Sequence, residues 1–160
     1  MKLSRAEKLL WLAASVALLH HVDHVLRVDH SGWPFTPEVS PFTFSLIIYP
    51  VFLSVFFLKS RPWYRVSGTA LLFLFSVFAH AFLETPVDQY RTWAYGSDFP
   101  GHVGQHNLLG RDSKFLGVCA VVVTVLLSLT LLAALLAFLR EARGGETKAH
   151  PKRPRSGASA

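Results

Sequence analysis

The sequence predicts an all-α integral membrane protein: a four-helix bundle with both termini in the cytoplasm and a structured extracytoplasmic loop between its third and fourth helices. Three observations carry this prediction. Hydrophobic residues make up 51% of the 160-residue chain and are gathered into four blocks. Lysine and arginine concentrate in the segments that would lie on one side of a membrane. Histidine and the carboxylate residues concentrate in the segments that would lie on the other side.

Each apolar block is long enough to cross a bilayer, whose hydrocarbon core requires about 17 to 25 helical residues. The expected spans are residues 9–28, 42–58, 66–83 and 115–139, and a short cytoplasmic N-terminus precedes them at 1–8. We expect the first span to be retained, since its apolar run continues into His20 and His21 with no small-residue cleavage site of a signal peptide. Pro50 is expected to kink the second span, a feature that membranes tolerate.

Prolines and polar residues mark the ends of the helices. Ser40 followed by Pro41 predicts the start of the second span, and Thr85 followed by Pro86 predicts the end of the third. The connection 86–113 is longer than an ordinary turn, and its aromatic and histidine content predicts a folded outer cap. The basic segment 140–160, rich in Gly and Pro, is expected to be a disordered cytoplasmic tail.

The orientation follows from the basic residues. Of the 16 lysines and arginines, 12 lie before the first span, between the second and third, or after the fourth. Because basic flanking segments stay in the cytoplasm, a plasma membrane protein with both termini inside is expected. The net charge of +6 then reflects topology, and no phosphate loop or nucleic-acid motif suggests a nucleic-acid partner.

Histidines and carboxylates gather at the extracytoplasmic side. Seven of the eight histidines and seven of the ten carboxylates fall there. They are His20, His21, His24, His30, His80, His102 and His106, with Asp23, Asp29, Glu38, Glu84, Asp88, Asp98 and Asp112. Ionisable groups in or beside apolar helices are costly, so such a concentration indicates a functional site.

One face of the first span carries a candidate half-site. His20, Asp23, His24 and Arg27 are three or four residues apart, so they share a face of the helix. Arg27 is expected to pair with Asp23. His21 points about 100° away from His20 and is expected to form a hydrogen bond elsewhere.

The third span and the cap supply further candidates. His80 and Glu84 lie near the outer end of the third span, at a depth comparable with that of His20. His102 and His106 in the cap are again four apart. Their convergence predicts a metal site with His20, His24, His80, His102 and His106 as candidate ligands and with Glu84 and Asp23 as candidate catalytic carboxylates.

The donor set restricts the metal without naming it. Cys119 is the only cysteine and lies in the fourth span, so histidine and carboxylate remain as ligands. These donors suit zinc, iron, manganese or copper. In a hydrolytic version His20, His24 and His80 would hold the ion with Glu84 as general base, and His102 and His106 would form a lid or a second site. Haem between His20 and His80 is an alternative, and so is a metal-free polar cluster.

Three functional classes therefore remain open from the sequence. The first is a metal-dependent hydrolase or oxidase that acts on a lipid or small molecule at the outer leaflet. The second is a redox or carrier protein that binds haem or a metal. The third is a metal-free accessory subunit of a larger membrane complex. A bundle of this size is too small for a conventional transporter unless it forms a homo-oligomer.

Overall fold

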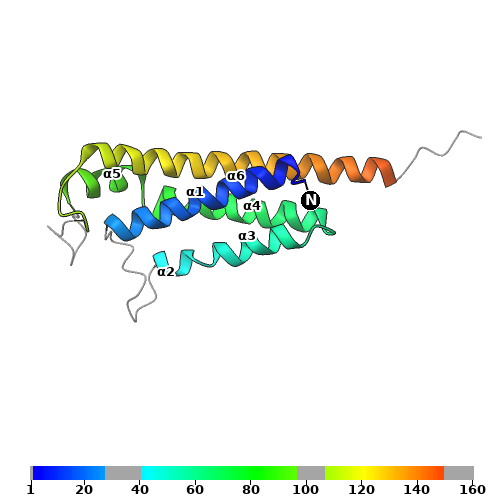
Figure 1. The fold of residues 1–160 in the computed structure, drawn as a ribbon, viewed down its shortest axis with the longest axis horizontal. Coiled ribbons are helices and arrows are strands. Elements are labelled where there is room, and N and C mark those ends of the chain that lie inside the picture. The colour runs from blue at the N-terminus through cyan, green and yellow to red at the C-terminus, as the bar shows by residue number, and fades with distance from the viewer. Residues whose placement is uncertain (1, 28–40, 97–106, 150–160) are drawn as a thin grey trace, which may run out of the picture.

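A computed structural model of the chain describes residues 2–27, 41–96 and 107–149, and within these ranges every regular element is helical (Figure 1). The elements are α1 (Arg5–Arg27), α2 (Pro41–Ser45), α3 (Ile48–Phe57), α4 (Pro62–Phe78) with the π-helical turn η1 (Ala79–Leu83), α5 (Pro86–Tyr95) and α6 (Lys114–Ala149). α1 and α4 run in one direction, whereas α3 and α6 run in the other. α6 lies along the whole bundle and packs against α1, α4 and α5.

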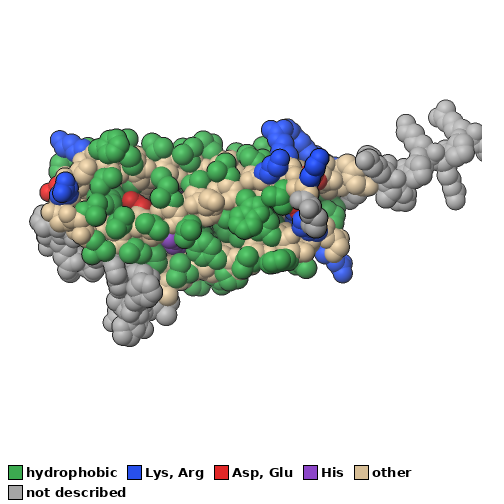
Figure 2. All heavy atoms as spheres, viewed as in Figure 1, with side chains coloured by type: hydrophobic (Ala, Val, Ile, Leu, Met, Phe, Trp, Pro, Cys, Tyr) green, Lys and Arg blue, Asp and Glu red, His purple; other side chains and the backbone are tan. Residues whose placement is uncertain are grey.

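Three of the helical segments are long and apolar enough to cross a membrane. They are Arg5–Arg27, Pro62–Leu83 and Lys114–Gly145, with 23, 22 and 32 residues. These segments contain most of the first, third and fourth predicted spans. Large hydrophobic side chains cover the outside of the bundle between its charged ends in the view of Figure 2, as expected for helices that face lipid.

The second predicted span differs from the other three. Its apolar stretch Phe42–Phe57 is shorter than a full span and is broken between α2 and α3. Pro50 explains the break, since its ring clashes with the carbonyl of the residue four positions earlier, Leu46. That carbonyl instead accepts a hydrogen bond from the backbone N–H of Tyr49, at 3.2 Å. The kink expected at Pro50 is therefore a complete break one turn earlier.

The start of α1 and the end of α6 extend several residues beyond the predicted spans. α1 begins at Arg5 because Ser4 and Glu7 form a reciprocal cap: the Ser4 N–H donates to the Glu7 carboxylate (2.9 Å) and the Glu7 N–H donates to the Ser4 hydroxyl (3.2 Å). α6 continues to Ala149, past residue 139 and into the segment 140–160 predicted to be disordered. Ala142 remains buried there, so core contacts outlast the apolar run.

The helices α1 and α6 meet along two stripes of small and branched side chains. On α1 the buried residues repeat at intervals of three and four, as in a coiled coil. They are Ala6, Leu10, Ala13 and Ala17 on α1, with Leu127, Leu131, Ala134 and Phe138 on α6. Small residues allow close approach of helices in a membrane. The next buried residues along these two faces, toward the end opposite the N-terminus, are His20 on α1 and Thr124 on α6. Polar side chains therefore replace apolar ones at that end of the core.

A second polar cluster closes the opposite end of the bundle. The buried Glu7 carboxylate accepts a hydrogen bond from Arg65 (3.0 Å) and pairs with Lys59 (2.8 Å). The Arg65 guanidinium lies over the ring of Phe138, 4.3 Å from its centroid. These contacts join α1, α4 and α6 where the N-terminus lies. The bundle therefore has an apolar middle and a polar cluster near each end.

Part of the predicted outer cap folds as a helix. Thr85 and Asp88 form a capping box with Pro86 at the first helical position, so the sequence that ends the third span also begins α5. α5 packs closely on α6 because Gly117 has no side chain: an added Cβ would lie 2.8 Å from the carbonyl oxygen of Tyr90. Residues 97–106 of the cap lie outside the described ranges.

Candidate metal centre

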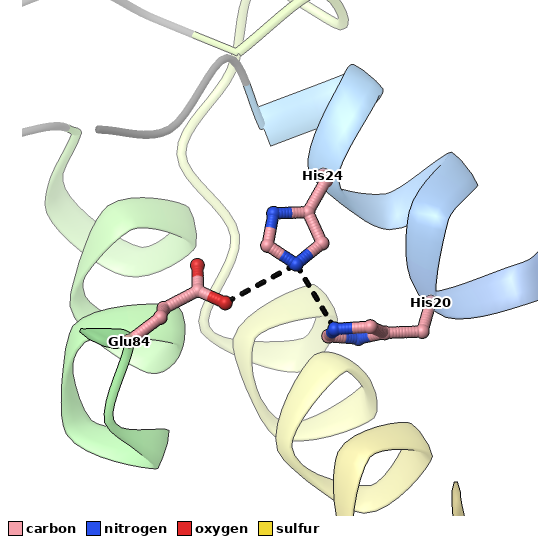
Figure 3. Close-up of side chains that lie close together, drawn as sticks. All are labelled: His20, His24 and Glu84. Carbon is pink, nitrogen blue, oxygen red and sulfur yellow. Dashed lines mark hydrogen bonds and ion pairs between the residues drawn. The ribbon is translucent and has the colours of Figure 1, made fainter. Parts of the chain in front are cut away.

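Three ligand-type side chains converge near the end of the bundle opposite the N-terminus (Figure 3). His20 and His24 project from successive turns of α1, and Glu84 follows directly after the π-helical turn η1. His20 and Glu84 are each 4% exposed, so the site is shielded from its surroundings. One potential ligand atom from each residue lies within 4.8 Å of the other two.

Two of the three distances among these atoms are close to those between neighbouring ligands of one metal ion. His24 Nε2 lies 2.9 Å from His20 Nε2 and 3.3 Å from the nearer Glu84 carboxylate oxygen. Ligands about 2.1 Å from a zinc ion lie about 3.0 Å apart in an octahedron and about 3.4 Å apart in a tetrahedron. The side chains could therefore hold a metal ion.

A closed set of hydrogen bonds fixes the orientation of His20. Thr124 on α6 donates its only hydroxyl proton to the side-chain oxygen of Gln89 on α5, at 2.8 Å. Toward His20 Nδ1, 3.4 Å away, the same hydroxyl can therefore only accept. The proton of His20 then lies on Nδ1, and its Nε2 presents a lone pair to His24. A histidine that ligates a metal through one nitrogen commonly donates from the other in this way.

Gln89 also orients the carboxylate. Its side-chain amide donates to Glu84 (3.2 Å) and to His80 Nδ1 (3.2 Å). Since Gln89 is fully buried, both amide protons are used inside the protein. Gln89 therefore couples the Glu84 carboxylate to His20 through Thr124, and it ties α5 and α6 to the site.

His80 lies beside the three convergent residues but is held differently. Its ring contacts that of His20 edge to face, with the centroids 4.7 Å apart. Because His80 Nδ1 accepts a hydrogen bond from Gln89, the ring proton of neutral His80 lies on Nε2. In this state His80 offers a proton rather than a lone pair at Nε2.

Asp23 occupies a neighbouring ion-pair network. One carboxylate oxygen accepts a hydrogen bond from Arg27 Nε (2.8 Å), and the other accepts one from the Trp93 indole (2.8 Å). Arg27, which is 1% exposed, also donates to Glu84. The predicted pair between Asp23 and Arg27 is confirmed. Asp23 links α1 to α5 through Trp93, and Arg27 links α1 to the Glu84 carboxylate.

His21 forms its hydrogen bonds outside the convergent residues, as the helical geometry predicts, although its ring centroid lies 6.2 Å from that of His24. Its Nε2 lies 2.8 Å from the Ser45 hydroxyl of α2, and its Nδ1 lies 2.9 Å from the Tyr49 hydroxyl of α3. His21 therefore joins α1 to the broken second apolar segment.

The structure brings together five of the seven predicted site residues. His20, His24 and Glu84 form the cluster, His80 touches it, and Asp23 reaches it through Arg27. His102 and His106 lie outside the described residues. Sequence reasoning did not select Gln89, Thr124 or Trp93. Thr124 was the most accessible signal, because it interrupts a run of valine and leucine in an otherwise apolar span.

A cavity of about 360 Å³ adjoins the cluster. His20, His24, His80 and Glu84 line its polar end, and apolar residues of α3, α4 and α6 line the remainder. Its volume falls within the usual range of small-molecule pockets, about 300 to 1,000 Å³.

Comparisons of the chain with protein-family models, with curated proteins and with solved structures found no match.

Proposed function

We propose that this protein is an integral membrane metalloprotein in which His20, His24 and Glu84 hold one transition metal ion near the extracytoplasmic face. The observation that carries the proposal is the spacing of 2.9 and 3.3 Å between the candidate ligand atoms. A cation at this point would replace the proton that His24 Nε2 shares with its two neighbours, as metal binding generally does.

The donor set favours zinc or iron. Two histidines and one carboxylate hold the zinc of several hydrolases, and the same combination holds iron(II) in non-haem oxygenases. Both types of site keep at least one coordination position open for water or substrate. A bound ion of this kind would supply an activated water or a site for oxygen chemistry.

The surroundings favour a metal-dependent enzyme over a carrier. The cluster opens into a cavity that could admit a substrate, whereas a purely structural site is normally closed by four protein ligands. In the proposed enzyme Glu84 serves as a ligand, and His80 lines the cavity beside it as the candidate general acid or base. Asp23 positions Glu84 through Arg27 and is not proposed to touch the substrate.

Haem fits the site less well than a single ion. The rings of His20 and His80 are in edge-to-face contact, which leaves no space for a porphyrin between them. In addition, Gln89 donates to His80 Nδ1, so His80 presents a proton and not a lone pair at Nε2.

We further propose that the bundle spans the plasma membrane with both termini in the cytoplasm. The supporting observation is the distribution of Lys and Arg. Of these 16 residues, 12 lie in the N-terminus, in the connection between the second and third predicted spans, and in the C-terminal tail, as the positive-inside rule requires of cytoplasmic segments. The metal cluster then lies near the outer leaflet, within reach of a lipid or small-molecule substrate.

Elemental analysis of the protein purified in detergent without chelators tests the metal proposal directly. We expect about one zinc or iron ion per chain, the stoichiometry of a site with a single open position. An absorption spectrum recorded on the same sample detects haem independently through its Soret band. A colourless protein that is metal-free and does not take up Zn²⁺ or Fe²⁺ on dialysis would refute the site and favour the accessory-subunit alternative.

Replacement of Gln89 by leucine should weaken the metal site without removing a ligand. We expect a loss of about 10- to 100-fold in metal affinity, as for other residues that orient a ligand. Competition with a chromophoric chelator measures the effect. Thr92→Val on the same helix is the control, since the Thr92 hydroxyl donates only within α5. Equal affinities of Gln89→Leu and the control would show that the Gln89 contacts do not support the metal.

A further inference from the structure

The cavity beside the cluster is polar at one end and apolar along most of its length. Its polar end is formed by the histidines and Glu84. Away from that end, Phe52 of α3, Leu72 and Phe75 of α4, and Leu127 and Leu131 of α6 form the walls. Such a division suits a ligand that has a small polar head and a hydrocarbon body.

The residues that line the cavity extend over several turns of the helices. In the third apolar segment they include Leu72, Ser76, His80 and Glu84, which lie in successive turns. The 12 residues from Leu72 to Glu84 correspond to about 18 Å at the helical rise of about 1.5 Å per residue. A cavity of about 360 Å³ whose lining extends over this length is suited to one extended hydrocarbon chain.

The cavity also reaches the outer surface of the bundle. Leu83 lines it and is 48% exposed among the apolar side chains that would face lipid. In the view of Figure 2 a histidine side chain is visible between hydrophobic groups. A ligand could therefore enter sideways from the bilayer, where hydrocarbon chains are abundant and water is excluded.

We propose that the cavity binds a lipid with a single hydrocarbon chain and an anionic head group. The chain lies between α3, α4 and α6, and the head group occupies the open metal position at His20, His24 and Glu84. This inference rests on the proposed function for its metal. Without a cation, the Glu84 carboxylate of the cluster and the neighbouring Asp23 carboxylate share one arginine, Arg27. An anionic head is attracted there only when a cation is bound.

Photolabelling with a palmitate analogue that carries a diazirine on its chain tests the proposal. The full-length protein is reconstituted into phosphatidylcholine nanodiscs, so that single-chain detergents do not compete. We expect mass spectrometry to find the label on cavity residues of α4 and α6. Unlabelled palmitate should reduce the labelling, whereas methyl palmitate, which lacks the anionic head, and diacyl phosphatidic acid should not.

Two variants fill the cavity, and one matched variant does not. Leu72→Trp places the larger side chain inside the cavity, while Leu71→Trp places it on the neighbouring lipid-facing position, where Leu71 is 59% exposed. We expect Leu72→Trp to reduce labelling by about tenfold or more, the scale on which apolar pockets reject a poorly fitting chain. Leu127→Trp fills the same space from α6 and replaces Leu72→Trp should that variant fail to fold.

Metal content measured on the same samples separates the two proposals. Wild-type protein that contains metal but is labelled no more than Leu72→Trp and Leu127→Trp overturns the lipid inference and leaves the metal site intact. Wild-type protein that is labelled in the cavity without any metal refutes the proposed function, and it also overturns the placement of the head group. Metal-dependent labelling that both filling variants abolish supports the inference.

Discussion

His24→Ala should purify without its metal ion. His24 Nε2 is the atom that lies between His20 and Glu84, so its removal leaves two candidate ligands that are not in direct contact through a hydrogen bond. Loss of a residue that merely orients a ligand costs about 10- to 100-fold in metal affinity, and loss of a ligand should cost more than about 100-fold. Elemental analysis of the variant after gel filtration measures the loss.

His21→Ala provides the matched control for this experiment. It removes a histidine adjacent in sequence whose hydrogen bonds run to Ser45 and Tyr49 rather than into the cluster. We expect His21→Ala to keep its metal even where its thermal stability falls. Full metal content in His24→Ala, or equal losses in both variants, would contradict the assignment of the ligands.

Arg27→Met should destabilise the folded protein by about 3 to 5 kcal/mol, the usual cost of breaking a buried ion pair by removing one partner. Arg27 is buried and donates to both Asp23 and Glu84, so the variant leaves two carboxylates without this cation in an apolar surrounding. Methionine preserves much of the length of the side chain, which limits the contribution of lost packing. Denaturant unfolding in detergent micelles measures the free energy.

The origin of this effect can be isolated with further variants. Arg91→Met changes an exposed arginine of α5 and should alter stability by no more than about 0.5 kcal/mol. Combining Arg27→Met with Glu84→Gln removes one of the stranded charges and should recover part of the loss. A double variant that is destabilised by the full sum of the single changes would show that Arg27 acts through packing and not through its charge on Glu84.

The long helices of this fold could be predicted from the sequence, whereas the broken second apolar segment and the short helix α5 could not. Apolar length alone located most of α1, α4 with η1, and α6. Pro50 predicts a disturbance at the Leu46 carbonyl, but the sequence does not specify whether the helix bends there or breaks completely between α2 and α3. α5 was missed because the Thr85–Asp88 capping box was interpreted only as the end of a span.

The part of the candidate site that depends on the spacing of residues along a helix could be predicted from the sequence. The shared face of His20, His24 and Arg27 follows from their spacing, and the comparable depth of His80 follows from the parallel course of α1 and α4. The division of roles between Glu84 and His80 did not follow. It depends on Gln89, which contacts both residues from a helix that the sequence analysis did not predict.

The π-helical turn at Ala79–Leu83 sets the angular position of Glu84. At about 100° per residue, 12 residues of regular α-helix would leave Glu84 about 120° around the axis from Leu72. A π-helical turn contains one residue more than an α-helical turn, and here the hydrogen bond from the Glu84 N–H to the Ala79 carbonyl closes it. The additional residue reduces the angle between Leu72 and Glu84 to about 20°. Deleting one residue within this turn would therefore give an ordinary α-helix that still directs Glu84 toward the cavity. Inserting one would rotate it away, so the number of residues in this segment is as much a determinant of the site as their identity.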